Sequence, residues 1–218
     1  MRNYFDEQLA LLNREMIEMG ALCEEVIALA ASALISGDVY FAAKVTARDK
    51  EIDKKERNIE TLCLKLLLEQ QPVARDLRQI SAALKMITDM ERIGDQAENI
   101  AEITLSLGGR SLETQDVLKK MGVATMKMVT DSVDAYVKQD VALAQAVIEY
   151  DDVVDNCFID VKKQLIEYIS AESNDGEYAL DLLMIAKYFE RIGDHATNLA
   201  EWVIYSVTGV HESEEEKA

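Results

Sequence analysis

Apolar residues recur every three or four positions along most of the chain, which is the spacing of one packed face of an α-helix. In residues 39–69 the clearest series falls every seven residues, at Val45, Ile52, Ile59 and Leu66. The chain has one proline and nine glycines, so few residues interrupt these periods. The pattern predicts six long helices. The first three cover residues 4–35, 39–69 and 73–107. The fourth has a polar start at 111–116 and ends at 138, and the last two cover residues 141–170 and 177–207.

The predicted helices are separated by short polar breaks. Gly37 suits the left-handed position that ends a helix, and Asp38 suits the N-cap of the next one. Pro72 follows the second helix, a pair of glycines follows the third, and Gln139–Asp140 repeats the Gly37–Asp38 arrangement. Because connections this short make consecutive helices antiparallel neighbours, each set of three helices should form an up-down-up bundle.

A string of twelve residues, ERIGDQAENIAE at 91–102, occurs again 99 residues on as ERIGDHATNLAE at 190–201. Nine of the twelve positions are identical, and a spacing this long is typical of a duplicated unit. The shared residues are mostly polar, which indicates a repeated site. We predict an all-α fold of two tandem, pseudo-symmetric three-helix bundles of long antiparallel helices, over residues 1–109 and 110–209, with an acidic tail at 210–218.

Composition narrows the class of protein. Apolar residues make up 49% of the chain, which is enough for a core, and the formal net charge is -18. A surface this acidic argues against nucleic acid as a partner and favours cations or basic protein surfaces. Three widely separated cysteines predict buried thiols. The start of the sequence does not resemble a signal peptide, and the longest apolar run, residues 26–35, is too short to cross a bilayer, so we expect a cytoplasmic protein without direct membrane insertion.

Four pairs of acidic residues stand four positions apart, so that each pair shares one helix face. They are Asp49 and Asp53, Glu91 and Asp95, Asp151 and Asp155, and Glu190 and Asp194.

Helix geometry predicts that these pairs meet. In an antiparallel hairpin, residues equidistant from the turn face each other, because the rise per residue is the same in both arms. Asp49 with Asp95, and Asp53 with Glu91, are both centred on Pro72. Asp151 with Asp194, and Asp155 with Glu190, are both centred between residues 172 and 173, inside the second predicted turn. Each hairpin should therefore carry a cluster of four carboxylates.

Carboxylates this close raise one another's pKa, so they need shared protons, basic partners or a metal ion. Arg92 and Arg191 lie about a quarter turn from the acidic faces and could flank them. Oxygen-only ligands favour magnesium, calcium, manganese or iron. His195 follows Asp194 directly and so lies off its face, and Gln96 takes its place in the first copy. The sequence contains no recognisable nucleophile–base constellation and no phosphate-binding glycine loop, so we do not expect an enzyme.

The strings QPVARDLR at residues 71–78, ERIGD at 91–95 and YFERIGDHATNLAEW at 188–202 resemble the phosphate-uptake regulator PhoU family. The resemblance covers nearly the whole chain. It implies a homodimer that binds iron or zinc clusters at Asp49, Asp53, Glu91, Asp95, Asp151, Asp155, Glu190 and Asp194. It also implies a negative regulator of phosphate uptake and phosphate-starvation signalling, an adaptor between the ATPase of the phosphate ABC transporter and a sensor histidine kinase, peripheral to the inner membrane through these partners.

Two other interpretations fit the same residues. The carboxylate clusters could serve a metal-dependent hydrolase or a metal store. Alternatively, the protein could be a metal-free helical adaptor whose acidic residues are paired with arginine.

Overall fold

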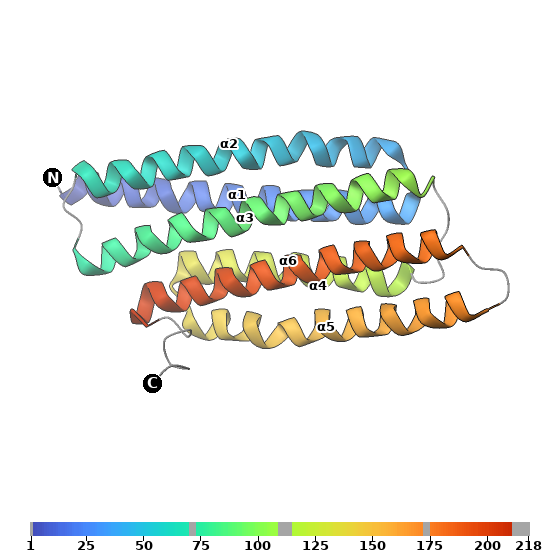
Figure 1. Cartoon of the computed structure of the whole chain (residues 1–218). Helices are drawn as coiled ribbons and strands as arrows, with labels where there is room; N and C mark the ends of the chain where they lie inside the picture. Colours follow the sequence, from blue (N-terminus) through green and yellow to red (C-terminus); the bar gives the residue numbers. More distant parts are fainter. Residues whose placement is uncertain (1, 70–72, 109–114, 172–174, 211–218) are drawn as a thin grey trace.

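The structure is a computed structural model that describes residues 2–69, 73–108, 115–171 and 175–210, and every regular element in these ranges is a helix (Figure 1). The helices are α1 (Arg2–Ser36), α2 (Val39–Glu69), α3 (Ala74–Ser106), α4 (Gln115–Lys138), α5 (Val141–Ser170) and α6 (Gly176–Thr208). The bounds agree with the sequence prediction to within two residues wherever the predicted end falls among described residues. The turn centres at residues 72 and 172–173, the domain boundary at 109–110, the start of the polar segment 111–116 and most of the acidic tail lie outside the described residues.

The breaks between helices form as their residue types predict. Gly37 and Gln139 both have a left-handed backbone, with φ of 66° and 54°. Each is followed by an aspartate that caps the next helix: Asp38 accepts a hydrogen bond from the Tyr40 amide, and Asp140 accepts one from the Leu143 amide. These side chains satisfy amide groups that the first turn of a helix leaves without a partner.

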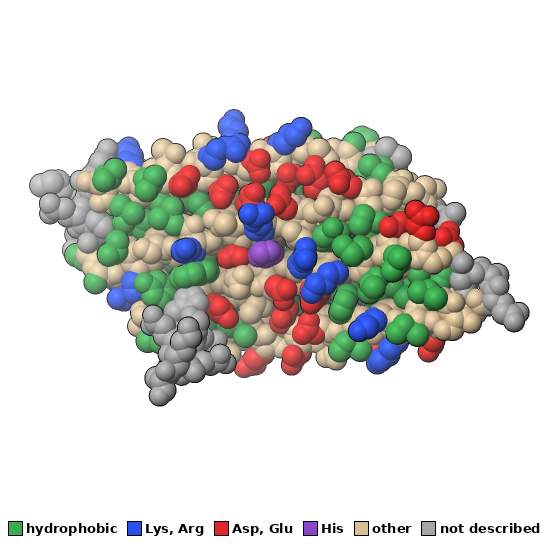
Figure 2. All heavy atoms as spheres, in the orientation of Figure 1, with side chains coloured by type: hydrophobic (Ala, Val, Ile, Leu, Met, Phe, Trp, Pro, Cys, Tyr) green, Lys and Arg blue, Asp and Glu red, His purple; other side chains and the backbone are tan. Residues whose placement is uncertain are grey.

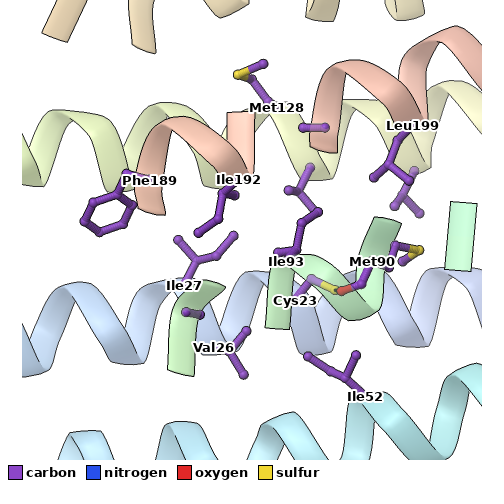
Figure 3. Close-up of a cluster of buried hydrophobic side chains, with 14 of the residues drawn as sticks. Cys23, Val26, Ile27, Ile52, Met90, Ile93, Met128, Phe189, Ile192 and Leu199 are labelled. Carbon is purple, nitrogen blue, oxygen red and sulfur yellow. The ribbon is translucent and has the colours of Figure 1, made fainter. Parts of the chain in front are cut away.

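The six helices form two three-helix layers, α1–α3 and α4–α6, that lie face to face with their long axes roughly aligned (Figure 1). Consecutive helices pack within each layer, and α3 against α6 and α1 against α4 join the layers. One hydrophobic core runs through both halves. In Figure 3, Ile93 of α3, Ile192 of α6 and Ile27 of α1 point into the same space. The two three-helix bundles therefore pack against each other through one shared core.

Helix α1 contains an 18-residue stretch with a mean hydropathy of 1.6, although the helix also carries charged residues such as Glu15 and Glu18. By length and composition Tyr4–Ser36 therefore qualifies as a membrane span. The sequence expectation considered only the uninterrupted run at residues 26–35 and did not anticipate this. In the structure 44% of the apolar stretch is buried, and α1 packs against α2, α3 and α4. Contact with three helices requires apolar residues on more than one side of α1, which accounts for its composition.

Candidate functional site

The first acidic cluster consists of Asp49 and Asp53 on α2 with Glu91 and Asp95 on α3, halfway along the hairpin. Burial is the largest cause of the raised pKa of both Asp49 and Glu91. The three other carboxylates also raise the pKa of Asp49, and Asp95 and Asp53 raise that of Glu91, so the four groups lie close enough to interact. Figure 2 shows acidic side chains gathered in two groups at mid-length, one over α2 and α3 and one over α5 and α6. The structure therefore brings together the carboxylates whose equal distances from the turn predicted that they would meet.

Asp49 is the most enclosed member of the first cluster. Its relative exposure is 8%, and its Oδ1 atom is buried with no hydrogen-bond partner. The pKa of Asp49 is raised to about 7, first by burial and then by the charges of Glu98, Asp53, Asp95 and Glu91. A buried carboxylate oxygen that lacks a donor is costly, so this position is suited to a proton or a cation.

Two glutamates extend the first cluster beyond the predicted four residues. Glu98 has the largest effect of any neighbouring charge on the pKa of Asp49, and Glu56 contributes to the raised pKa of Glu91. The sequence search used pairs four residues apart and so missed them as site residues. A spacing of three residues could have identified them. Glu98 follows Asp95, and Glu56 follows Asp53, at that distance on the same helix face.

Arginines partly neutralise the first cluster from its solvent side. Arg92 lies 3.5 Å from a Glu91 oxygen and 3.3 Å from an Asp95 oxygen, and Arg57 lies 3.9 Å from an Asp53 oxygen. Asp49 has no such partner among the described ion pairs. The arginines therefore reach the half-buried carboxylates and leave Asp49 without an ion pair in the part of the chain that the structure describes.

The second acidic cluster consists of Asp151 and Asp155 on α5 with Glu190 and Asp194 on α6. The pKa of Asp151 is raised to about 6, first by burial and then by the charges of Asp155, Asp194, Glu190 and Asp152. Burial, and next Glu190, also raise the pKa of Asp194.

The second cluster differs from the first in its surroundings. Phe158 and Thr197 occupy the positions equivalent to Glu56 and Glu98. Lys187 forms an ion pair with Glu190 and lies 5.7 Å from the centre of the Phe158 ring. Arg191, which the sequence placed beside the acidic face, lies 5.9 Å from the Tyr188 ring. The second cluster therefore carries two fewer glutamates than the first.

A glycine of the repeated string makes room for one aspartate of each cluster. A Cβ atom on Gly94 would lie 2.6 Å from Asp49 Oδ1, and one on Gly193 would lie 2.8 Å from Asp151 Oδ1. Both distances are shorter than real Cβ contacts. The aspartate of one helix thus lies directly against the backbone of the next, which explains why glycine stands at mid-helix in both copies.

Gly94→Ala is expected to lower the free energy of unfolding by about 1 kcal/mol. Alanine favours the helix by about 1 kcal/mol, but displacing a packed side chain costs about 1–3 kcal/mol. Asp49 and the Ile52 Cδ1 atom, 3.2 Å from the added Cβ, would both have to move. Urea unfolding measures the change.

Gly176→Ala is the matched control, since a Cβ there meets nothing within 4 Å and should not destabilise the protein. In an Asp49→Ala background the cost of Gly94→Ala should become smaller, because the clashing carboxylate is gone. A Gly94→Ala protein as stable as the parent would contradict this role of the glycine.

The donor set of both clusters fits a hard or borderline cation, because every group is a carboxylate and Asp49 Oδ1 is buried without a partner. In the part of the chain that the structure describes, no three Asp, Glu, His or Cys side chains are grouped tightly enough to hold one metal ion between them. Like charges repel, so bringing these oxygens onto one ion would require a positive counter-charge.

His195 does not contact the second cluster through its Nδ1 atom. It faces α3 instead, where Nδ1 lies 2.9 Å from Asp89 Oδ1. The sequence analysis placed His195 off the acidic face but gave no indication of this partner, which is 106 residues away.

The sequence profile of the PhoU domain matches the chain twice, over residues 16–104 and 118–203, and each match contains one acidic cluster. The chain therefore belongs to the PhoU family, as the repeated strings suggested. A Clostridium acetobutylicum protein named phosphate-specific transport system accessory protein PhoU homolog is 35% identical, with 95% of this chain and 96% of that protein covered. A Zymomonas mobilis protein of the same name is 37% identical, with 94% and 87% covered.

Solved structures agree with the fold. The crystal structure of PhoU from Pseudomonas aeruginosa has a TM-score of 0.89 and 35% identity, and covers 94% of this chain and 100% of that one. The phosphate transport system regulatory protein PhoU from Streptococcus pneumoniae has a TM-score of 0.87 and 26% identity, with 95% and 98% covered. The all-α prediction of two tandem three-helix units is confirmed.

Proposed function

We propose that this protein is a negative regulator of phosphate uptake and of phosphate-starvation signalling. The observation that carries the proposal is the double PhoU match, together with relatives that are named accessory proteins of the phosphate-specific transport system. Those names describe accessory or regulatory proteins, which supports a role without catalysis.

In this proposal the chain acts as an adaptor between the ATPase of the phosphate ABC transporter and a sensor histidine kinase. The net charge of -18 suits basic surfaces on such partners. Large apolar side chains also remain exposed near the second hairpin turn, namely Ile166, Ile169, Leu180 and Met184. Apolar residues exposed at neighbouring positions on two helices are typical of protein-binding surfaces. The adaptor would work at the cytoplasmic face of the membrane as a homodimer held by its partners.

Both acidic clusters would bind metal ions. Asp49, Asp53, Glu91 and Asp95 would hold one site, and Asp151, Asp155, Glu190 and Asp194 the other. When bound, the ion would supply positive charge that neutralises the carboxylates and ties α2 to α3 or α5 to α6. The resemblance to the family favours iron or zinc, whereas the all-oxygen donor set also suits magnesium, manganese or calcium.

A reporter of phosphate-starvation genes tests the regulatory role. Deleting the gene should switch the reporter on in phosphate-rich medium, and the wild-type protein should switch it off again. Crosslinking in the same cells should capture the transporter ATPase and the kinase. Leu180→Asp with Met184→Asp should weaken capture, whereas Val123→Asp, which alters an exposed valine on α4, is the control.

A reporter that ignores the deletion would refute the proposal. Turnover of phosphate esters by the purified, metal-loaded protein would favour the alternative of a metal-dependent hydrolase. Metal retention without either partner binding or turnover would favour a metal store.

A further inference from the structure

Apolar side chains alone fix the packing of α3 against α6 only loosely. Ile93 of α3 and Ile192 of α6 are fully buried and point into the space that the two helices share (Figure 3). Burial of such side chains is not directional, and the ridges of one helix can pack into the grooves of another at more than one offset. A directional contact can select one of these offsets.

Asp89 of α3 makes such a contact with α6 through one carboxylate oxygen. Its Oδ1 atom lies 2.9 Å from His195 Nδ1 and accepts a hydrogen bond from Asn198 Nδ2 at 3.1 Å. The His195 and Asp89 side chains are only 23% and 16% exposed. The contact is therefore largely removed from water, which would otherwise replace a lost partner at little cost.

The contact is sensitive to the offset between the two helices. His195 and Asn198 are three residues apart, so they reach Asp89 from a single turn of α6. A slip of α6 by one turn, about 5.4 Å, would carry both side chains out of reach of Asp89, so that both contacts would be lost together. Losing partners of a largely buried polar group is costly, and one buried polar side chain can fix the register of a coiled coil.

The pseudo-symmetric position lacks this contact. The three residues that stand there, 99 positions away from each partner, are Tyr188, Gln96 and Asn99. Gln96 Oε1 is buried without a hydrogen-bond partner, and Asn99 donates to the Asp95 carbonyl oxygen of its own helix at 2.8 Å. Among the described residues, the polar contact between α3 and α6 is therefore made on one side of the pseudo-symmetry axis only.

Another hydrogen bond between the two halves is less selective. Tyr136 of α4 donates to the Gln79 carbonyl oxygen of α3 at 3.4 Å. A backbone carbonyl group occurs at every residue of α3, so this bond does not depend on which side chain stands opposite Tyr136. It therefore distinguishes one offset from another less strictly than the contact at Asp89 does.

We infer that the contact of Asp89 with His195 and Asn198 is a latch that sets the offset of one half of the molecule against the other. The latch acts within one chain and requires neither a bound cation nor a partner protein. Each half carries one acidic cluster, so the latch also sets where the two clusters lie relative to each other.

Methyl NMR of the full chain, labelled at isoleucine and kept in a chelating buffer, tests the latch. In the wild type, Ile93, Ile192 and Ile52 should each give one sharp signal. In Asp89→Ala the single signals of Ile93 and Ile192 should be lost by splitting or broadening, because α3 and α6 then sample more than one offset. Ile52 of α2 packs against α3 of its own half and should stay sharp. Single, sharp signals of Ile93 and Ile192 in Asp89→Ala would overturn the latch.

Asn198→Ala decides the question if Asp89→Ala does not fold, because it removes only one of the two attachments. It should split or broaden the signals of Ile93 and Ile192 to a smaller extent. Asn99→Ala is the matched control and should leave these signals single, since the hydrogen bond of Asn99 is to its own helix. Spectra of Asn198→Ala and Asn99→Ala that show the same pattern would also overturn the latch.

Discussion

In a chelating buffer at pH 8, Asp49→Asn is expected to raise the free energy of unfolding by about 2–4 kcal/mol. Asp49 has a pKa of about 7 in the folded protein, whereas an aspartate in an unfolded chain ionises near pH ~4. Above pH 4 the folded state therefore holds a proton that the unfolded state has released. Stability falls as the pH rises from about 4 to about 7 and is constant above that, because the buried carboxylate is then ionised in both states.

Urea unfolding at pH 4, 6 and 8 measures this difference. The variant and the wild type should be nearly equal at pH 4 and diverge as the pH rises, because asparagine has no proton to lose. Asp151→Asn should act in the same direction but less, since the pKa of Asp151 is about 6. Glu149→Gln, which removes an exposed acid on α5, is the control. Parallel pH profiles of Asp49→Asn and the wild type would show that Asp49 ionises in the folded protein without cost.

Replacing the four acids of one cluster is expected to remove that cluster's share of bound metal completely. Protein purified without a chelator should retain metal in both halves. The variant Asp49→Asn, Asp53→Asn, Glu91→Gln, Asp95→Asn should keep only the metal of the second half. The equivalent variant at Asp151, Asp155, Glu190 and Asp194 should keep only that of the first. Elemental analysis with native mass gives the metal content per chain and the oligomeric state.

The control for this experiment removes the same four negative charges elsewhere, at the exposed residues Asp6, Glu7, Glu149 and Asp160. It should retain all of the metal, because local convergence of oxygens and not net charge holds the ion. Unchanged metal in the cluster variants would refute the sites. If the wild type has no metal, the metal-free adaptor with acids paired to Arg92 and Arg57 becomes the better interpretation.

Much of the fold followed from local patterns. The helix ends at Gly37 and Gln139 were predictable because left-handed residues and capping aspartates act within a few positions of the chain. The pairing of Asp49 with Asp95 was predictable because antiparallel arms advance equally from a shared turn. Each of these features depends only on spacing along one hairpin, and spacing is visible in the sequence.

Other features depended on packing between helices that no local period specifies. Glu98 raises the pKa of Asp49 across the α2–α3 contact, and the repeated Gly94 turned out to leave room for one carboxylate oxygen. Asp89 and His195 meet because α3 lies against α6, at a rotation and offset that the apolar stripes of the two helices do not fix uniquely.

The sequence by itself determined the six helices, their pairing into two repeated hairpins and the two acidic quartets, because helix rise and periodicity are the same wherever a helix forms. The tertiary structure alone decided that the halves share one core, that Asp49 is buried while the other carboxylates of its cluster are half-buried, and that Asp89 of α3 meets His195 of α6. Burial and contacts between distant helices result from how all six helices fill space together, and the repeated string cannot specify them.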